Sequence, residues 1–269
     1  MLGIEPKFSV VMCVNRANPW LNQAIDSVLE QDDGDFEFLI SANACSDDLW
    51  EEIEEKVRSD HRVRLFRSSI GQLAFNLNLL ADHARGEYLV RMDADDVCEP
   101  CRVGTLRRAL RQHPVDVLGS AVTLIDGEGL VVGRMDFPLT QEDIQLAIRS
   151  RTTFCHPAVV LRRQFLLDMR GYLGGFVSED TDLWLRAMRR GANMQNLPDA
   201  LLRYRVHENQ SIASRFGYAE VASHWLRELL ISPSWYTFHG FAIAMGKSLM
   251  VSLLPGVRRY KKDIGENRR

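Results

Sequence analysis

Short apolar segments alternate with helical patterns over the first 92 residues, and this alternation is the strongest constraint on the fold. The segments expected to be strands are 8–14, 36–41, 63–66 and 88–92. Between them, apolar residues recur at helical spacing within 20–29, 49–57 and 73–84. Repeated strand–helix units predict a mostly parallel sheet with helices on both faces, in which ligands bind at the carboxyl ends of the strands.

The second half of the chain is less regular. Strands are expected at 116–119, 123–125, 130–133, 157–161 and 201–206, and helices at 140–149 and 181–190. From about residue 211 onward the pattern is mainly helical. We therefore predict an α/β catalytic domain over 1–210 and a helical C-terminal extension over 211–269.

The charge balance indicates which partners the protein can bind, and the cysteine content indicates the compartment in which it works. The chain has 33 basic and 36 acidic residues, whereas a nucleic-acid-binding protein normally carries a strong basic excess, so no nucleic-acid partner is expected. Five scattered cysteines argue against a disulfide framework and favour a reducing compartment. The first residues also lack the features of a signal peptide, which predicts a cytoplasmic protein.

Three carboxylates follow the fourth expected strand, at Asp93, Asp95 and Asp96. Carboxylates this close repel one another unless something neutralises them, and a hard divalent cation with oxygen ligands does so. Mg²⁺ or Mn²⁺ fits better than Zn²⁺, because no cluster of histidines or cysteines lies beside the acids. The alternative is a capped turn in which Asp95 or Asp96 begins the next helix.

A second acidic cluster, Glu179, Asp180 and Asp182, lies at the expected start of a helix, where the helix dipole favours carboxylates. Simple capping explains this cluster when it is considered alone. When the two acidic clusters are considered together, one could hold a metal–phosphate group while the other supplies a general base. Two histidines near expected strands, His156 and His207, are candidate site residues, although a lone histidine is usually structural or on the surface.

Taken in order, five stretches resemble glycosyltransferase family 2. Together they span roughly residues 8–210, and they are 8–31, 36–47, 71–88, 91–96 (RMDADD), and 154–186, which includes FCHP, GY and EDTDLWLR. The resemblance implies the GT-A fold, a Rossmann-like α/β sheet flanked by helices.

The resemblance also implies a role for each matching residue. On the donor side it points to Asn43, Asp47, Asn78, Arg91, Asp93 and Asp95. Asp93 and Asp95 would also bind Mn²⁺ or Mg²⁺, with His207 as a further metal ligand. Asp180 matches the catalytic base, and Glu179, Asp182 and His156 match its support or the acceptor contacts. Where the family usually has an Asp after the second strand this chain has Ala42, so we expect Asn43 to contact the base instead.

By this resemblance the chain is an inverting glycosyltransferase that uses a nucleotide-diphosphate sugar. UDP is the family default, with dTDP and GDP left open. The acceptor would be a hydroxyl of a growing or lipid-linked glycan, in the synthesis of a cell-surface polysaccharide, lipopolysaccharide or capsule. Two alternatives remain at this point: an inactive sugar-nucleotide-binding or scaffold subunit, and a nucleotidyltransferase.

The C-terminal tail combines an apolar segment with a basic one. Residues 235–254 are rich in apolar side chains, but Lys247 interrupts them, which favours a helix lying in a membrane interface over one that crosses the membrane. The basic residues between Arg258 and Lys262 would then meet anionic headgroups at the inner face of the cell membrane. The alternative is a core or dimer helix followed by a solvated tail.

Overall fold

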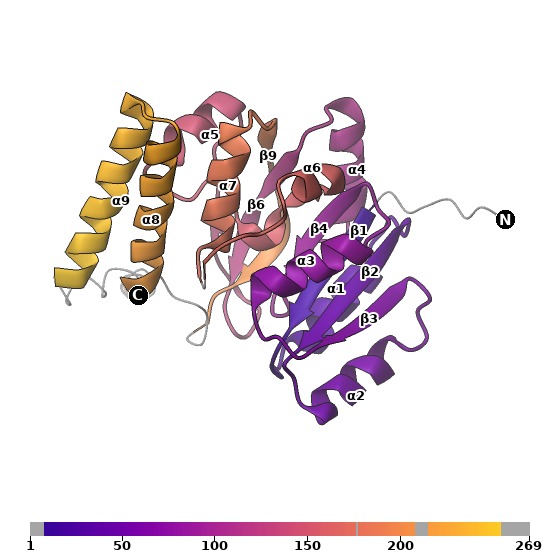
Figure 1. Cartoon of the computed structure of the whole chain (residues 1–269). Helices are drawn as coiled ribbons and strands as arrows, with labels where there is room; N and C mark the ends of the chain where they lie inside the picture. The colour runs from indigo at the N-terminus through magenta and orange to yellow at the C-terminus, as the bar shows by residue number, and fades with distance from the viewer. Residues whose placement is uncertain (1–7, 176, 208–214, 254–269) are drawn as a thin grey trace, which may run out of the picture.

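The computed structural model describes residues 8–175, 177–207 and 215–253 (Figure 1). In the first half, strands alternate with helices in the order β1 (Phe8–Val14), α1 (Leu21–Leu29), β2 (Phe36–Asn43), α2 (Asp47–Val57), β3 (Val63–Ser68), α3 (Leu73–His83) and β4 (Tyr88–Met92). Every strand pair among these four is parallel, in the order β3-β2-β1-β4. The alternating pattern therefore predicted this half of the fold correctly.

The same sheet continues through the second half in the order β4-β8-β6-β9-β5, with β7 paired to β6. The elements are β5 (Val97–Cys98), α4 (Arg102–Gln112), β6 (Val117–Ile125), β7 (Val131–Met135), α5 (Gln141–Ala147), the 3₁₀-helix η1 (His156–Ala158), β8 (Val160–Arg162), α6 (Arg163–Asp168), α7 (Glu179–Arg189), β9 (Met194–Arg205), α8 (Arg215–Ile231) and α9 (Trp235–Leu253). Because β8 runs antiparallel to β4 and β6, this half of the sheet is mixed.

Several expected elements differ in the structure. The two strands expected at 116–119 and 123–125 are one strand, β6, and the last strand, β9, begins seven residues before the expected 201. The strand expected at 157–161 starts later, because Pro157 lies in η1. Neither Asp95 nor Asp96 begins a helix, since β5 follows them and α4 starts at Arg102. The elements β5, α4 and α6 were not predicted.

The core lies on both faces of the sheet. Successive residues of β1 alternate between the two faces, with Val10 and Met12 on one and Val11 on the other. Helices α1, α2 and α4 cover the first face, and α3 and α5 to α9 contribute to the second. Burial on both faces explains why most residues of β1, β2 and β4 are apolar.

The strand register brings the candidate donor residues to one edge. Met12 of β1 is opposite both Ile40 of β2 and Met92 of β4, so the carboxyl ends of the three strands lie side by side. Asn43 ends β2, and Asp93 directly follows β4. The expected position of the ligand site is therefore the position at which these side chains meet.

Helices α8 and α9 form a hairpin at the end of the molecule away from β3 (Figure 1). They pack closely because Gly240 lies against Trp225: a Cβ at this glycine would be 2.3 Å from the indole ring. The inner face of α9 consists of small residues, namely Thr237, Gly240, Ala244 and Ser248.

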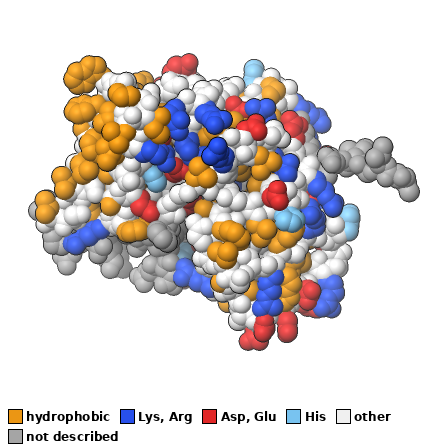
Figure 2. Space-filling view, in the orientation of Figure 1, with side chains coloured by type: hydrophobic (Ala, Val, Ile, Leu, Met, Phe, Trp, Pro, Cys, Tyr) orange, Lys and Arg blue, Asp and Glu red, His pale blue; other side chains and the backbone are white. Residues whose placement is uncertain are grey.

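The outer face of α9, by contrast, carries large apolar side chains. Trp235 is 85% exposed and Leu253 74%, and Phe238, Leu249 and Met250 are also exposed. Figure 2 shows the apolar side chains gathered over this end of the molecule. No helix within the described residues is long and apolar enough to cross a membrane. The expected basic run between Arg258 and Lys262 lies outside the described residues, as do 211–214.

Candidate active site

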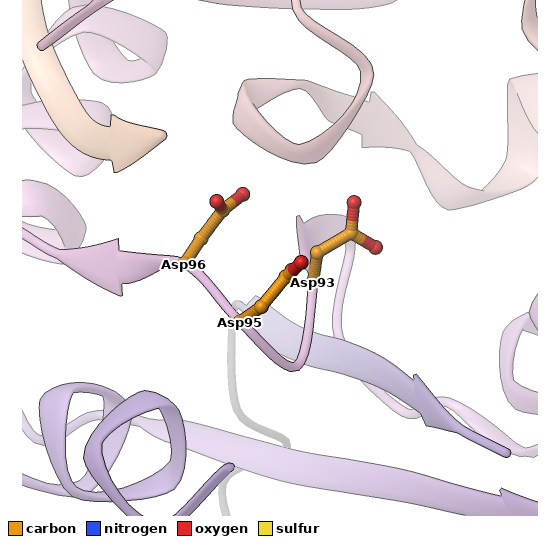
Figure 3. A group of neighbouring side chains, drawn as sticks. All are labelled: Asp93, Asp95 and Asp96. Atoms are coloured by element: carbon orange, nitrogen blue, oxygen red, sulfur yellow. The ribbon is translucent and has the colours of Figure 1, made fainter. Parts of the chain in front are cut away.

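The loop between β4 and β5 carries the three carboxylates expected to hold a metal (Figure 3). One oxygen each of Asp93, Asp95 and Asp96 lies within 4.8 Å of the others. Asp96 is 1% exposed, while Asp93 and Asp95 are half-buried. Burial, together with the charges of Asp93 and Asp95, raises the pKa of Asp96 well above its usual range. The cluster therefore concentrates negative charge, which a bound cation would neutralise.

The end of β9 holds this loop in place. The Arg205 backbone N–H donates to Asp96 Oδ1 at 2.8 Å, and its Nε donates to the Asp95 carbonyl oxygen at 2.8 Å. The same guanidinium also donates to the Asp126 carbonyl oxygen and to Gln23 Oε1. Sequence reasoning did not single out Arg205, because its partners lie about a hundred residues earlier in the chain.

His207 contacts one carboxylate of the cluster, and its expected role as a metal ligand stays a prediction. Its Nε2 lies 2.9 Å from Asp95 Oδ2, and its ring lies 4.7 Å from the ring of Trp20. Among the described residues, two buried polar atoms of the cluster have no hydrogen-bond partner, Asp96 Oδ2 and His207 Nδ1. The three carboxylates offer hard oxygen donors at one place, which fit a divalent cation such as Mn²⁺ or Mg²⁺.

Arg91 of β4 contacts the acidic loop, and its charge also acts on the second acidic cluster. Its Nη2 contacts Asp93 Oδ1 at 2.8 Å, and the side chain is almost completely buried. Burial disfavours the Arg91 charge, but attraction to Asp93 outweighs this and raises its pKa. Its positive charge also partly offsets the increase that burial causes in the pKa values of Glu179 and Asp180. Within the described chain, its Nε and Nη1 have no hydrogen-bond partner. An anionic ligand here would find two buried donors.

The second cluster lies at the start of α7. Burial, and then the charge of Asp180, raises the pKa of Glu179 to about 7. Burial also raises the pKa of Asp180, whose Oδ1 accepts a hydrogen bond of 2.6 Å from the Thr181 backbone N–H. Glu179 is therefore partly protonated near neutral pH, which limits its repulsion of the Asp180 carboxylate.

His156 connects this cluster to Tyr172. Its Nδ1 lies 3.7 Å from Glu179 Oε1, and its Nε2 lies 3.0 Å from the Tyr172 hydroxyl. Burial, reinforced by Arg91, lowers the pKa of His156 well below its usual range, so the ring is neutral at pH 7. The structure brings His156 beside Glu179, and the expected roles of both residues stay predictions.

The side chains of Asn78 and Asp182, two expected site residues, form hydrogen bonds with other residues of the protein. Asn78 donates to the Tyr172 carbonyl oxygen and accepts from the Tyr172 N–H, each at 2.9 Å. The adjacent Gly171 has φ +68°, and a Cβ there would lie 2.3 Å from Asn78 Oδ1, so this junction requires glycine. Asn78 thus holds Tyr172 in the site, and the direct donor contact expected for it stays a prediction.

Asp182 is fully buried, and its oxygens accept from Arg186 and Arg227. Burial raises the pKa of Asp182, but attraction to Arg186 and hydrogen bonds from both arginines outweigh this and lower it. Arg186 also donates to the carbonyl oxygens of Met169 and Gly171. Through Arg186, Asp182 is therefore linked to the backbone of Met169 and Gly171, and its role in acceptor binding stays a prediction.

On the nucleotide side, Asn43 and Asp47 differ in exposure. Asn43 is 3% exposed, and its Oδ1 has no hydrogen-bond partner in the described chain. Asp47, at the start of α2, is 81% exposed and pairs with Arg67. Both lie at the carboxyl end of β2, so they remain candidates for contact with a nucleotide base.

Comparison with known proteins places these features in a family. The sequence model of Glycosyl transferase family 2 matches residues 9–170. A relative, the O-antigen biosynthesis glycosyltransferase WbnJ of Escherichia coli, is 34% identical over 233 residues, which is 85% of this chain and 91% of the relative.

Solved structures share the fold at low sequence identity. S. aureus TarS 1–349 in complex with UDP-GlcNAc superposes with a TM-score of 0.72 at 18% identity, over 94% of this chain and 77% of that one. The mannosyltransferase PcManGT of Pyrobaculum calidifontis, in complex with GDP-Man and Mn²⁺, gives 0.65 at 15% identity, over 97% and 80%. From the family match and the identity to WbnJ, the chain belongs to glycosyl transferase family 2 and is a glycosyltransferase.

Proposed function

We propose that this enzyme transfers a sugar from a UDP-sugar to a hydroxyl of a growing cell-surface glycan, with inversion at the anomeric carbon. The observation that carries the proposal is Arg91, a buried cation that contacts Asp93 at 2.8 Å and whose charge also acts on Glu179 and Asp180. If the guanidinium of Arg91 bound the diphosphate, the sugar would lie between the two acidic clusters. The name of WbnJ supports a polysaccharide acceptor, and the complex of TarS with UDP-GlcNAc supports a UDP-sugar donor.

The donor would bind across the carboxyl ends of β1, β2 and β4. Asn43 would offer its unpartnered amide oxygen to the base, and Arg91 would donate to the diphosphate. Asp93, Asp95 and His207 would hold Mn²⁺ or Mg²⁺, and the Asp96 carboxyl lies beside them. When bound, such an ion supplies positive charge that offsets the charge developing on the leaving diphosphate.

Asp180 would act as the general base. The acceptor oxygen forms a bond to the anomeric carbon while the bond from that carbon to the diphosphate oxygen breaks, and the hydroxyl proton passes to Asp180. Attack on the face opposite the leaving group inverts the centre. Neutral His156 and the largely buried Glu179 would orient the acceptor and keep the site dry.

Thermal stabilisation by nucleotide diphosphates tests the donor site directly. We expect UDP with Mn²⁺ to raise Tm by several degrees at a concentration of about 100 Kd, since this contributes about 2.7 kcal/mol. UDP without the metal, and GDP or dTDP with it, should shift Tm less. Equal shifts with all three nucleotides would contradict the choice of UDP. Binding without any sugar turnover would favour the inactive-subunit alternative.

We also propose that the α8–α9 hairpin rests on a membrane that carries anionic lipids, where a lipid-linked acceptor would be found, at the cytoplasmic face. The support is the inverted pattern of α9, with small residues facing α8 and Trp235 and Phe238 facing solvent. In sequence, the basic residues between Arg258 and Lys262 follow this helix and match anionic headgroups in charge.

Flotation with vesicles containing phosphatidylglycerol, at low salt, tests this docking. We expect the wild type to float with the vesicles, and the double variant Trp235→Ser/Phe238→Ser to lose at least about tenfold in partitioning, because each side chain contributes roughly 1.5–3 kcal/mol when buried. The matched control is Val131→Ser/Val132→Ser on β7, which removes two exposed apolar side chains away from the hairpin. Equal flotation of all three proteins, or none of the wild type, would contradict the proposal.

A further inference from the structure

The segment that leads into α7 is tied to α8. The Ser178 hydroxyl lies 3.0 Å from Glu220 Oε2 and 3.1 Å from His224 Nε2. The Val177 backbone N–H donates to the same Glu220 oxygen at 3.2 Å. Ser178 is 3% exposed, so this contact is shielded from solvent. Two side chains of the C-terminal hairpin therefore fix the residues directly before Glu179 and Asp180.

The hydrogen bonds of this tether have a defined direction. The Ser178 hydroxyl has one proton, and a carboxylate only accepts, so the hydroxyl donates to Glu220. His224 must then donate its Nε2–H to the Ser178 oxygen. Burial lowers the pKa of His224, in keeping with a neutral ring that has one N–H. His224 therefore donates to Ser178, and Ser178 donates to Glu220.

Ser178 occupies the position that usually caps a helix, yet its side chain caps nothing in α7. Instead, Asp180 Oδ1 accepts from the Thr181 N–H, which an N-cap side chain would normally satisfy. The start of α7 is thus organised by two arrangements: the serine is turned toward α8, and the Asp180 side chain is fixed against the first turn.

A second set of contacts joins the same face of α8 to the body of α7. Arg227 donates to Asp182 and to Glu228, and Arg189 of α7 donates to Glu228 Oε2 at 2.7 Å. Together with Glu220 and His224, the α8 residues follow the i, i+4, i+7, i+8 spacing of one helix face. The side chains of Leu183 and Trp184 are buried in the body of α7, while the tether holds the residue directly before its first turn.

We propose that Glu220 and His224 are positioning residues, which act through Ser178 to hold Asp180 at the distance and angle that proton transfer from the acceptor requires. This inference rests on the proposed role of Asp180 and extends it to the C-terminal hairpin. The loop before Ser178 contains Gly174 and Gly175, the latter at φ +84°, and such a loop offers little stiffness of its own. Displacement of a catalytic group by about 1 Å can reduce the rate by about 10²-fold.

The test compares Glu220→Ala, Ser178→Ala and Glu220→Gln with the control Ser223→Ala, an exposed serine of the same helix. We expect Glu220→Ala and Ser178→Ala to lower kcat at least about tenfold, with the KM for the UDP-sugar unchanged. Glu220→Gln keeps an oxygen that accepts from Ser178 and Val177, so it should restore most of kcat. Ser223→Ala should match the wild type.

Hydrogen–deuterium exchange of 177–182 provides a readout that does not need turnover. We expect faster exchange there in Glu220→Ala and Ser178→Ala, and wild-type exchange in the two other variants. Unchanged exchange and kcat in Glu220→Ala would overturn the proposal, as would a lower Tm with wild-type kcat per folded molecule. Wild-type inactivity with every donor would contradict the proposed function instead, while the exchange data would still report whether the tether exists.

Discussion

Asp180→Asn should reduce sugar transfer by roughly 10²- to 10⁴-fold while UDP-sugar binding stays at the wild-type level. The amide has the shape of the carboxylate, and its oxygen can still accept from the Thr181 N–H, so the first turn of α7 should keep its geometry. The amide cannot take the acceptor proton. Initial rates and calorimetric Kd values for UDP, measured on the same preparations, separate the loss of chemistry from the loss of binding.

The matched control for this variant is Asp199→Asn, which removes a carboxylate from an exposed position on β9. Glu179→Gln is the informative comparison, because glutamine mimics the protonated form that the raised pKa of Glu179 favours. Its transfer rate should fall much less than that of Asp180→Asn. The opposite order of activities would transfer the role of base from Asp180 to Glu179.

Asp95→Asn should abolish the Mn²⁺-dependent part of UDP binding and lower transfer by at least about 10²-fold. The change removes one charge from the cluster yet leaves an oxygen that accepts from His207, so the loop should keep its fold. Thermal stabilisation by UDP, with and without Mn²⁺, measures the first effect, and initial rates measure the second.

Asp82→Asn is the corresponding control, because it removes an exposed carboxylate from α3 and leaves the cluster intact. It should retain both the metal-dependent shift and the rate. A full Mn²⁺-dependent shift in Asp95→Asn would exclude Asp95 from the metal site.

The first half of the fold was predictable because β1, β2 and β4 are short segments buried on both faces, and the helices between the strands repeat their apolar residues at helical spacing. The acidic residues after β4 were equally visible, since they follow one another in sequence. The family resemblance then linked them to Asp180, and family membership removes the nucleotidyltransferase alternative.

The remaining features depend on partners that are distant in sequence. Nothing local indicates that Arg205 holds Asp95 and Asp96, or that Asn78 anchors Tyr172. The helix α4 did carry a signal, the spacing of Val103, Leu106 and Leu110, which sequence reasoning overlooked. The contact of α8 with the residue directly before α7 belongs to the same group: Glu220 and His224 meet Ser178 across more than 40 residues of sequence.

The residues that contact the acidic loop lie far from it in the sequence, and this distance also determines when the loop can be ordered during synthesis. Asp96 meets Arg205 across 109 residues, and Asp95 meets His207 across 112. A nascent chain therefore completes its parallel half long before β9 emerges from the ribosome to order the acids. Prematurely terminated chains that lack β9 and His207 would have an acidic loop without its contacts to Arg205 and His207.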